Sequence, residues 1–120
     1  MKSKKNLRDE FNPNYTNKLG QNILHFLAHD GDVTAIDVLI AAGADPNKAD
    51  CDGMTPLHFA ALNGQVDAIG ILLKAGANPD AVTKAGLTIA DMARHKDHGE
   101  IAILFEHIER KRKNMLPPTP

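Results

Sequence analysis

The sequence predicts an all-α solenoid of stacked helix-turn-helix units with short outward β-turn loops. The first observation is a repeat, because shifting the chain by 33 positions superimposes glycines, prolines and histidines, among them Gly20, Gly53 and Gly86. The second is that the first two units each hold two apolar segments of helix length that end at glycine. One such helix pair is too small to bury its own apolar faces, so the units must stack.

The composition indicates one soluble domain. A chain of 120 residues can form one continuous core, and 42% hydrophobic residues exclude a wholly disordered chain. Cys51 is the single cysteine, so no intrachain disulfide can form. No signal peptide or run of eighteen apolar residues is present. We therefore expect a cytoplasmic, monomeric protein.

The charge is distributed unevenly along the chain. The formal net charge is −1, but residues 21–105 carry five basic and eleven acidic side chains, and both ends are basic. An acidic surface steers partners of the opposite sign. We therefore expect a partner with a basic patch, and we do not expect nucleic acid as the main partner.

Residues 1–16 are predicted to be a flexible basic arm. Lys2, Lys4, Lys5 and Arg8 supply the charge. Leu7 and Phe11 are spaced by four, which is helical spacing, and we expect them to fold over the open face of the first unit, because terminal repeats need a cap.

The first unit, residues 17–49, holds two predicted helices. Asn22 is a good N-cap for a short apolar helix that contains Ile23, Leu24, Phe26 and Leu27 and that Gly31 ends. A second helix follows from Asp32 until Gly43.

The second unit, residues 50–82, carries the sharpest signals. Thr55 can cap a helix in which Pro56 takes the first position, where its missing N–H costs nothing. Gly64 ends this helix, and Ile69 and Leu72 lie on the apolar face of the next one.

The third unit, residues 83–110, departs from the pattern. Thr88 keeps the capping role and Asp91 replaces the histidine, while the helix-ending glycine, Gly99, comes two residues late. The last helix is expected to continue into the basic run at 110–113, and residues 111–120 form a basic, proline-rich tail. This unit is therefore predicted to be a terminal cap.

The segment Thr55-Pro56-Leu57-His58, with Gly64 and the later Leu72-Leu73-Lys74-Ala75-Gly76-Ala77, resembles the ankyrin repeat. The resemblance implies a non-catalytic module that binds another protein through its finger loops and the concave surface of its first helices. It also implies that no cofactor is needed. The contact positions carried over by the resemblance are Lys18, Leu19, Gln21, His29, Asp30, Cys51, Asp52, Met54, Leu62, Asn63, Lys84, Ala85, Leu87 and Lys96.

Other kinds of site have weaker support. Asp91, His95 and His98 could be imagined as zinc ligands, but a site needs three or four convergent groups, and a solvated loop accounts for them better. The acids Asp45, Asp50, Asp52 and Asp80 lack calcium-loop spacing and are interpreted as solvated loop residues. No nucleophile elbow or phosphate loop is present, so we expect no enzyme activity.

Two alternative functions remain open from the sequence. One is an adaptor or regulatory subunit whose basic tail, residues 110–120, contacts nucleic acid or anionic lipid. The other is a fragment of an enzyme in which the repeats only position a catalytic domain.

Overall fold

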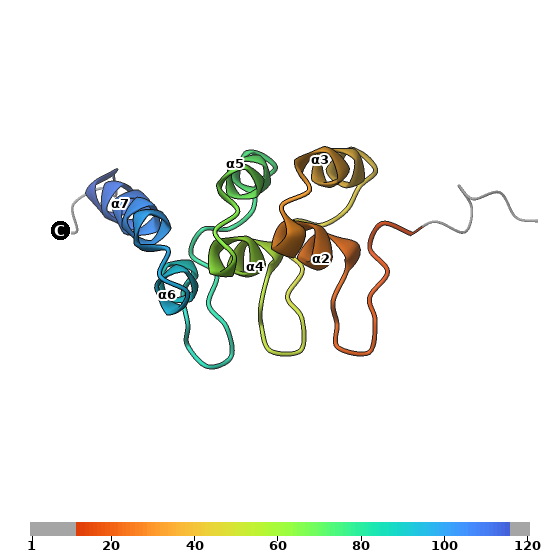
Figure 1. Ribbon diagram of the computed structural model, residues 1–120, viewed down its shortest axis with the longest axis horizontal. Coiled ribbons are helices and arrows are strands. Elements are labelled where there is room, and N and C mark those ends of the chain that lie inside the picture. The colour runs from red at the N-terminus through yellow and green to blue at the C-terminus, as the bar shows by residue number, and fades with distance from the viewer. Residues whose placement is uncertain (1–11, 116–120) are drawn as a thin grey trace, which may run out of the picture.

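The computed structural model describes residues 12–115, and this part of the chain folds into three helix pairs that stand side by side (Figure 1). The predicted all-α solenoid is confirmed, because the described residues form helices and loops without a strand. The helices are α2 (Ile23–Asp30), α3 (Val33–Ala41), α4 (Pro56–Leu62), α5 (Val66–Lys74), α6 (Ile89–His95) and α7 (Gly99–Met115).

The first helix of each pair begins at a capping box at the same phase of the repeat. The N-caps are Asn22, Thr55 and Thr88, and each side chain accepts a hydrogen bond from the backbone N–H three residues later. That third residue returns a side-chain bond to the backbone N–H of the cap. Both bonds satisfy amides that a helix start leaves unpaired, so the predicted starts are confirmed.

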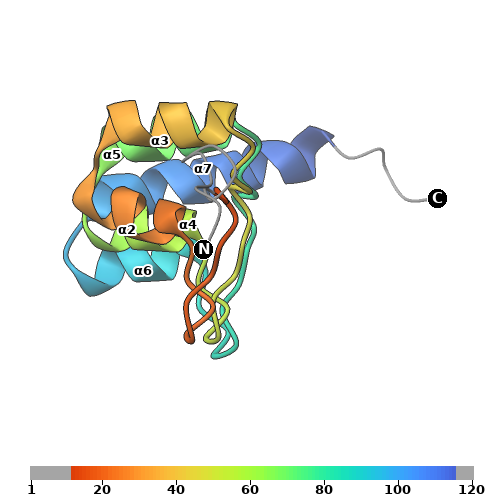
Figure 2. The same ribbon diagram turned by 90° about the vertical axis from the view of Figure 1, so that its right-hand side faces the viewer.

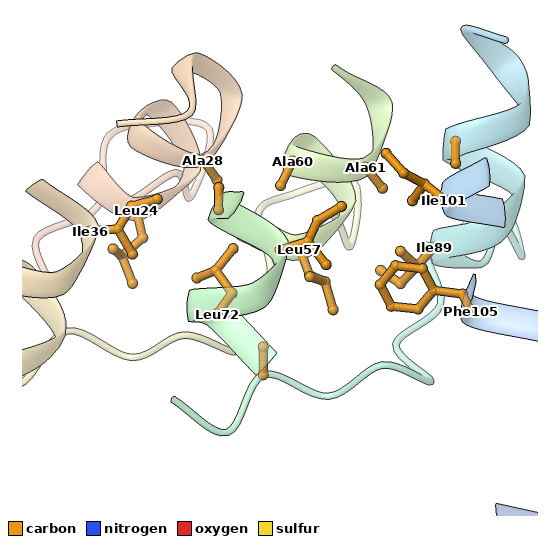
Figure 3. Packing of buried hydrophobic residues seen from close by; sticks show 14 of the residues in the cluster. Leu24, Ala28, Ile36, Leu57, Ala60, Ala61, Leu72, Ile89, Ile101 and Phe105 are labelled. Carbon is orange, nitrogen blue, oxygen red and sulfur yellow. The ribbon is translucent and has the colours of Figure 1, made fainter. Parts of the chain in front are cut away.

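We call the first helices of the pairs, α2, α4 and α6, the inner helices and the second ones, α3, α5 and α7, the outer helices. The core lies between these two rows (Figure 3). Ala60, Ala61 and Ala93 are fully buried, and their small side chains let neighbouring inner helices pack closely. Larger side chains fill the space between the inner and outer rows. Those that are fully buried include Leu24, Ile36, Leu57, Leu72 and Ile89.

Two buried histidines join each unit to the next. The Nδ1 atom of His25 accepts the N–H of Asn22 at 3.0 Å, and its Nε2 atom lies 2.9 Å from the carbonyl oxygen of Met54 in the following unit. His58 repeats the pattern, with Nε2 3.4 Å from the carbonyl oxygen of Leu87. A neutral ring protonated at Nε2 satisfies both bonds, and burial lowers the pKa of both imidazoles below the ordinary 6.5.

The third unit closes the array with polar side chains. Asp91 stands where the other units have histidine, and its bond from the Thr88 N–H holds its pKa below the ordinary value. Arg94, at the position of the buried Ala61, forms ion pairs with Asp91 at 3.0 Å and with Glu106 on α7. The helix α7 continues through the basic run at 110–113, as predicted, and extends to Met115, so it includes the first residues of the segment assigned to the tail.

The sequence placed the helix-ending glycine of the third unit wrongly. Gly31 and Gly64 have left-handed backbone, with φ of 75° and 68°, and the residue 33 positions after Gly64 is Asp97, with φ of 63°. Asp97 therefore makes the turn, and Gly99 begins α7. Aspartate is one of the few non-glycine residues that adopt this conformation without severe strain.

The predicted contact of Leu7 and Phe11 with the first unit lies outside the described residues. Within the arm assigned to residues 1–16, however, Asn14 has a defined place. Its side chain donates to the Gly43 carbonyl at 3.0 Å and accepts the Asp45 N–H at 2.7 Å. Residues 12–16 are thus tied to the loop of the first unit.

Acidification should lower the free energy of unfolding. Between the ordinary pKa of 6.5 and the lowered folded values, the unfolded chain binds more protons at His25 and His58 than the folded chain does. The stability from these rings is complete above the unfolded pKa and is lost as the pH falls toward the folded values. Urea unfolding followed by circular dichroism between about pH 7 and pH 5 measures this slope. A His25→Gln/His58→Gln variant that kept the full slope would contradict the assignment.

Replacing Asp97 by glycine should stabilise the protein. The change removes left-handed strain and a carboxylate at the end of α6, and we expect the free energy of unfolding to rise by roughly 0.5 kcal/mol. Asp97→Ala is the matched control, because it removes the charge but keeps a β-carbon at positive φ, and it should be less stable than the glycine variant. Denaturant midpoints in the order Ala above Gly would refute the explanation.

Candidate functional site

Three loops, residues 12–22, 42–55 and 75–88, project from the same side of the helix row and lie side by side (Figure 2). Their tips are joined by backbone hydrogen bonds. The Cys51 N–H donates to the Leu19 carbonyl at 2.8 Å, and the Lys84 N–H donates to the Asp52 carbonyl at 3.0 Å. Glycine permits this approach, since a β-carbon at Gly53 would lie 2.8 Å from the Lys84 nitrogen. The tips therefore form one continuous row.

Each tip is also held from within by a side chain at the same phase of the repeat. Asn17, Asp50 and Thr83 accept hydrogen bonds from backbone N–H groups of their own loops. Asp50 accepts from both Asp52 and Met54 at 2.9 Å and is buried. The interpretation of Asp50 as a solvated loop acid was therefore wrong, because its carboxylate is buried and its partners are two backbone amides of its own loop.

The bases of the loops are tied by a second asparagine. Asn47 donates from its side chain to the Gly76 carbonyl at 3.0 Å and accepts the Asn78 N–H at 2.6 Å. These are the bonds that Asn14 makes to the first unit. With base and tip both fixed, the loops are presented in one arrangement, so little ordering is left for a binding event.

Two hollows lie where the loops meet the inner helices. The first, of about 350 Å³, lies between α2 and α4 and is lined by Gln21, His25, Phe26, His29, Asp30 and Phe59. The second, of about 460 Å³, lies between the last two loops and α6. It is lined by Asp52, Met54, Thr83, Lys84, Ala85, Leu87 and Met92. We call the surface that includes both hollows and the three loop tips the concave surface.

The structure brings most of the predicted contact residues to these hollows. Gln21, His29 and Asp30 line the first hollow. The second is lined by Asp52, Met54, Lys84, Ala85 and Leu87. The remaining predicted residues lie around them: Lys18, Leu19 and Cys51 on the loop tips, Leu62 and Asn63 at the end of α4, and Lys96 after α6.

Sequence reasoning missed a row of large apolar side chains along the inner helices. Phe26, Phe59 and Met92 are 33 residues apart, and each lines one of the hollows. Phe26 is 51% exposed, whereas Leu24 in the same apolar helix is fully buried. The period itself was the available signal, since three large side chains recur at one phase. The His25 and Phe59 rings meet edge to face, with centroids 5.5 Å apart, which fixes the floor of the first hollow.

The predicted contact residues carry charges of both signs. Lys18, Lys84 and Lys96 are exposed there, together with Asp30 and Asp52. Other exposed acids lie away from the concave surface, for example Asp37 on α3 and Asp67 on α5. The concave surface therefore combines charges of both signs with apolar side chains, within a molecule whose middle part is acidic.

The side chains that can ligate a metal ion are dispersed over the described part of the chain. Among residues 12–115, no three histidine, cysteine, aspartate or glutamate side chains gather closely enough to hold a metal ion. Asp91, one of the imagined zinc ligands, is engaged by Thr88 and Arg94. None of the described helices combines the length and apolar character needed to cross a lipid bilayer.

Comparison with known proteins agrees with this geometry. A family model described as "Ankyrin repeats (3 copies)" matches residues 4–83, which is two thirds of the chain. A search of curated proteins found no match. The third helix pair lies beyond the matched range, and its caps and stacking continue the pattern of the first two. The chain therefore belongs to the ankyrin-repeat family, whose members are generally protein–protein interaction modules.

Proposed function

We propose that this protein binds another protein on its concave surface, with the apolar row and the loop tips as the contact. The observation that carries the proposal is the alignment of Phe26, Phe59 and Met92 beneath a row of loops tied together by backbone bonds. Of this row Phe26 is exposed and Phe59 is half-buried, and apolar side chains that remain accessible in a fixed concave setting are where a partner gains most from desolvation.

The second hollow is the proposed anchor point. Leu87 is 42% exposed and Met54 is half-buried, and both line the hollow above the buried Met92. The backbone of both residues is already bonded within the array, so their side chains are free to contribute to binding without loop rearrangement. A partner segment with one or two large apolar side chains, carried on a helix or an extended strand, fits this setting.

Charge contributes chiefly to the rate of encounter. The middle of the chain has an excess of six acidic side chains, while the concave surface itself is mixed. A partner with a basic patch would be drawn to the molecule at long range and then held by apolar contacts.

The anchor is tested by charging the two side chains. We expect Met54→Glu/Leu87→Glu to lower partner affinity by at least about tenfold, because burying a carboxylate in the hollow costs more than the lost apolar contact. Affinity purification with the wild-type chain identifies binders, and titration measures the loss. The matched control is Val38→Glu/Val66→Glu, which places the same charges at 60% exposed valines on the outer helices and should bind normally. Equal binding by both variants would refute the assignment of the surface.

The steering role predicts a dependence on ionic strength. Raising salt to about 0.5 M should slow association with the captured partner and change dissociation little, since exposed charges are screened beyond a few ångströms. Stopped-flow or surface-based kinetics measure both rates. Association that is independent of salt would remove the basic partner from the proposal and leave the apolar anchor intact.

A further inference from the structure

The two hollows of the concave surface differ in their chemistry. The first is lined by two phenylalanine rings and by the imidazoles of His25 and His29, and its one acidic lining residue is Asp30. The second is lined by aliphatic and thioether side chains, and its charged lining residues, Asp52 and Lys84, have opposite signs. Aromatic rings beside a carboxylate attract a cation, whereas the second hollow suits an apolar side chain.

The two phenylalanine rings of the first hollow are spaced for a flat group to lie between them. Phe26 and Phe59 occupy the same position on α2 and α4, which pack as neighbours. Packed helices lie about 8–10 Å apart, so a group midway between equivalent side chains lies about 4–5 Å from each. That distance is within the range of about 6 Å over which a cation and a ring attract each other. Phe26 is exposed and Phe59 half-buried, so both rings can be reached from solvent.

The carboxylate of Asp30 supplies the charge that a cation needs. Its side chain is 72% exposed, and its Oδ1 atom lies 3.1 Å from Nδ1 of His29. A carboxylate accepts several hydrogen bonds, so Oδ2 can accept from a ligand in the hollow. Asp30 is also the last residue of α2, where the helix dipole adds partial negative charge. Both features favour a positively charged occupant.

A further acceptor lies on the loop side of the hollow. Gln21 lines it there, and its side-chain oxygen accepts an N–H of Asn17 at 3.1 Å, which fixes the orientation of the amide. A carbonyl oxygen has two lone pairs, so it can accept a second N–H. Acceptors on two sides and rings on the other two match the guanidinium of arginine, which is planar and donates N–H bonds in a fixed fork.

We propose that the first hollow receives an arginine side chain of the partner, with its guanidinium between Phe26 and Phe59 and bonded to Asp30. This inference rests on the proposed function, because it names one side chain of the protein that the concave surface binds. It goes further in one respect: charge acts there on the rate of encounter, whereas here one charge is held in the bound state. The partner segment therefore carries an arginine for the first hollow and an apolar side chain for the second.

A small arginine derivative tests the first hollow without the partner. The probe is Nα-acetyl-arginine amide, titrated at low salt into the full, isotopically labelled chain. We expect the backbone amide signals of Phe26, His29, Asp30 and Phe59 to shift and to saturate in the millimolar range, as a fragment of this size allows. The matched control ligand is Nα-acetyl-citrulline amide, which keeps the planar shape but is uncharged, and it should cause no saturable shift.

Three variants of the chain locate the contact. Asp30→Asn should weaken binding of the probe about three- to fivefold, the effect of a partly exposed ion pair. Phe26→Leu, which removes a ring and keeps an apolar side chain, should weaken it about threefold. The control is Asp37→Asn, which removes the same charge from an exposed position on α3 and should bind the probe as the wild type does. Amide spectra verify that each variant keeps the fold.

Several outcomes would overturn the proposal. Equal shifts with the citrulline derivative would show that the positive charge is not recognised, and equal affinity for Nα-acetyl-lysine amide would remove the assignment to arginine. Shifts centred on Tyr15 and Ile23 would place the probe in a neighbouring hollow of about 390 Å³, which shares Phe26 but has no acidic side chain among its lining residues. Unchanged affinity in Asp30→Asn and Phe26→Leu would also contradict it. The titration needs no partner, so a failure of the apolar anchor in the second hollow is recognised separately.

Discussion

Every other feature of this protein depends on the contact between neighbouring helix pairs. A pair such as α4 and α5 has apolar side chains on more than one side and buries them only when α2 and α6 stand next to it. Alanines at the inner-helix contacts, Ala60 and Ala61 among them, keep the neighbours close. The histidine-to-carbonyl bonds then fix the register, because the His25 ring reaches the carbonyl of Met54 only when the units are correctly aligned.

The same stacking produces the candidate site. Loops of this length would sample many conformations if each stood alone. Here each loop tip donates a backbone hydrogen bond to the tip of the preceding loop, and the side chains of Asn47 and Asp50 bond to loop backbone outside the helices. The concave surface is therefore a consequence of the register, and its exposed side chains, such as Lys84 and Leu87, are not part of the buried core. This separation explains how one scaffold can present apolar anchors such as Leu87 outside its core.

The two ends of the array carry different side chains on their inner helices. At the C-terminal end, Arg94 stands where the preceding unit has a buried alanine, and it forms ion pairs with Asp91 and with Glu106. At the other end, Ile23 and Phe26 keep the apolar character of a stacking face. A charged face is stable in water and an apolar one gains from cover. The two ends therefore differ in the inner helices, whereas the outer helices of both ends expose apolar side chains, Val38 on α3 and Leu104 on α7.

The sequence by itself determined the architecture, because helix caps, helix-ending glycines and the 33-residue period are local or periodic signals. Thr55 with Pro56, and the replacement of histidine by Asp91, could be interpreted without coordinates. Three matters were decided only by tertiary structure: the burial of Asp50, the exposure of Phe26 and the turn made by Asp97. The exposure of Phe26 depends on which units lie beside α2, whereas Asp50 bonds to amides of its own loop and Asp97 adopts a left-handed backbone, and neither of these follows from spacing. Composition and spacing record a residue's own preferences, whereas burial depends on its neighbours in space.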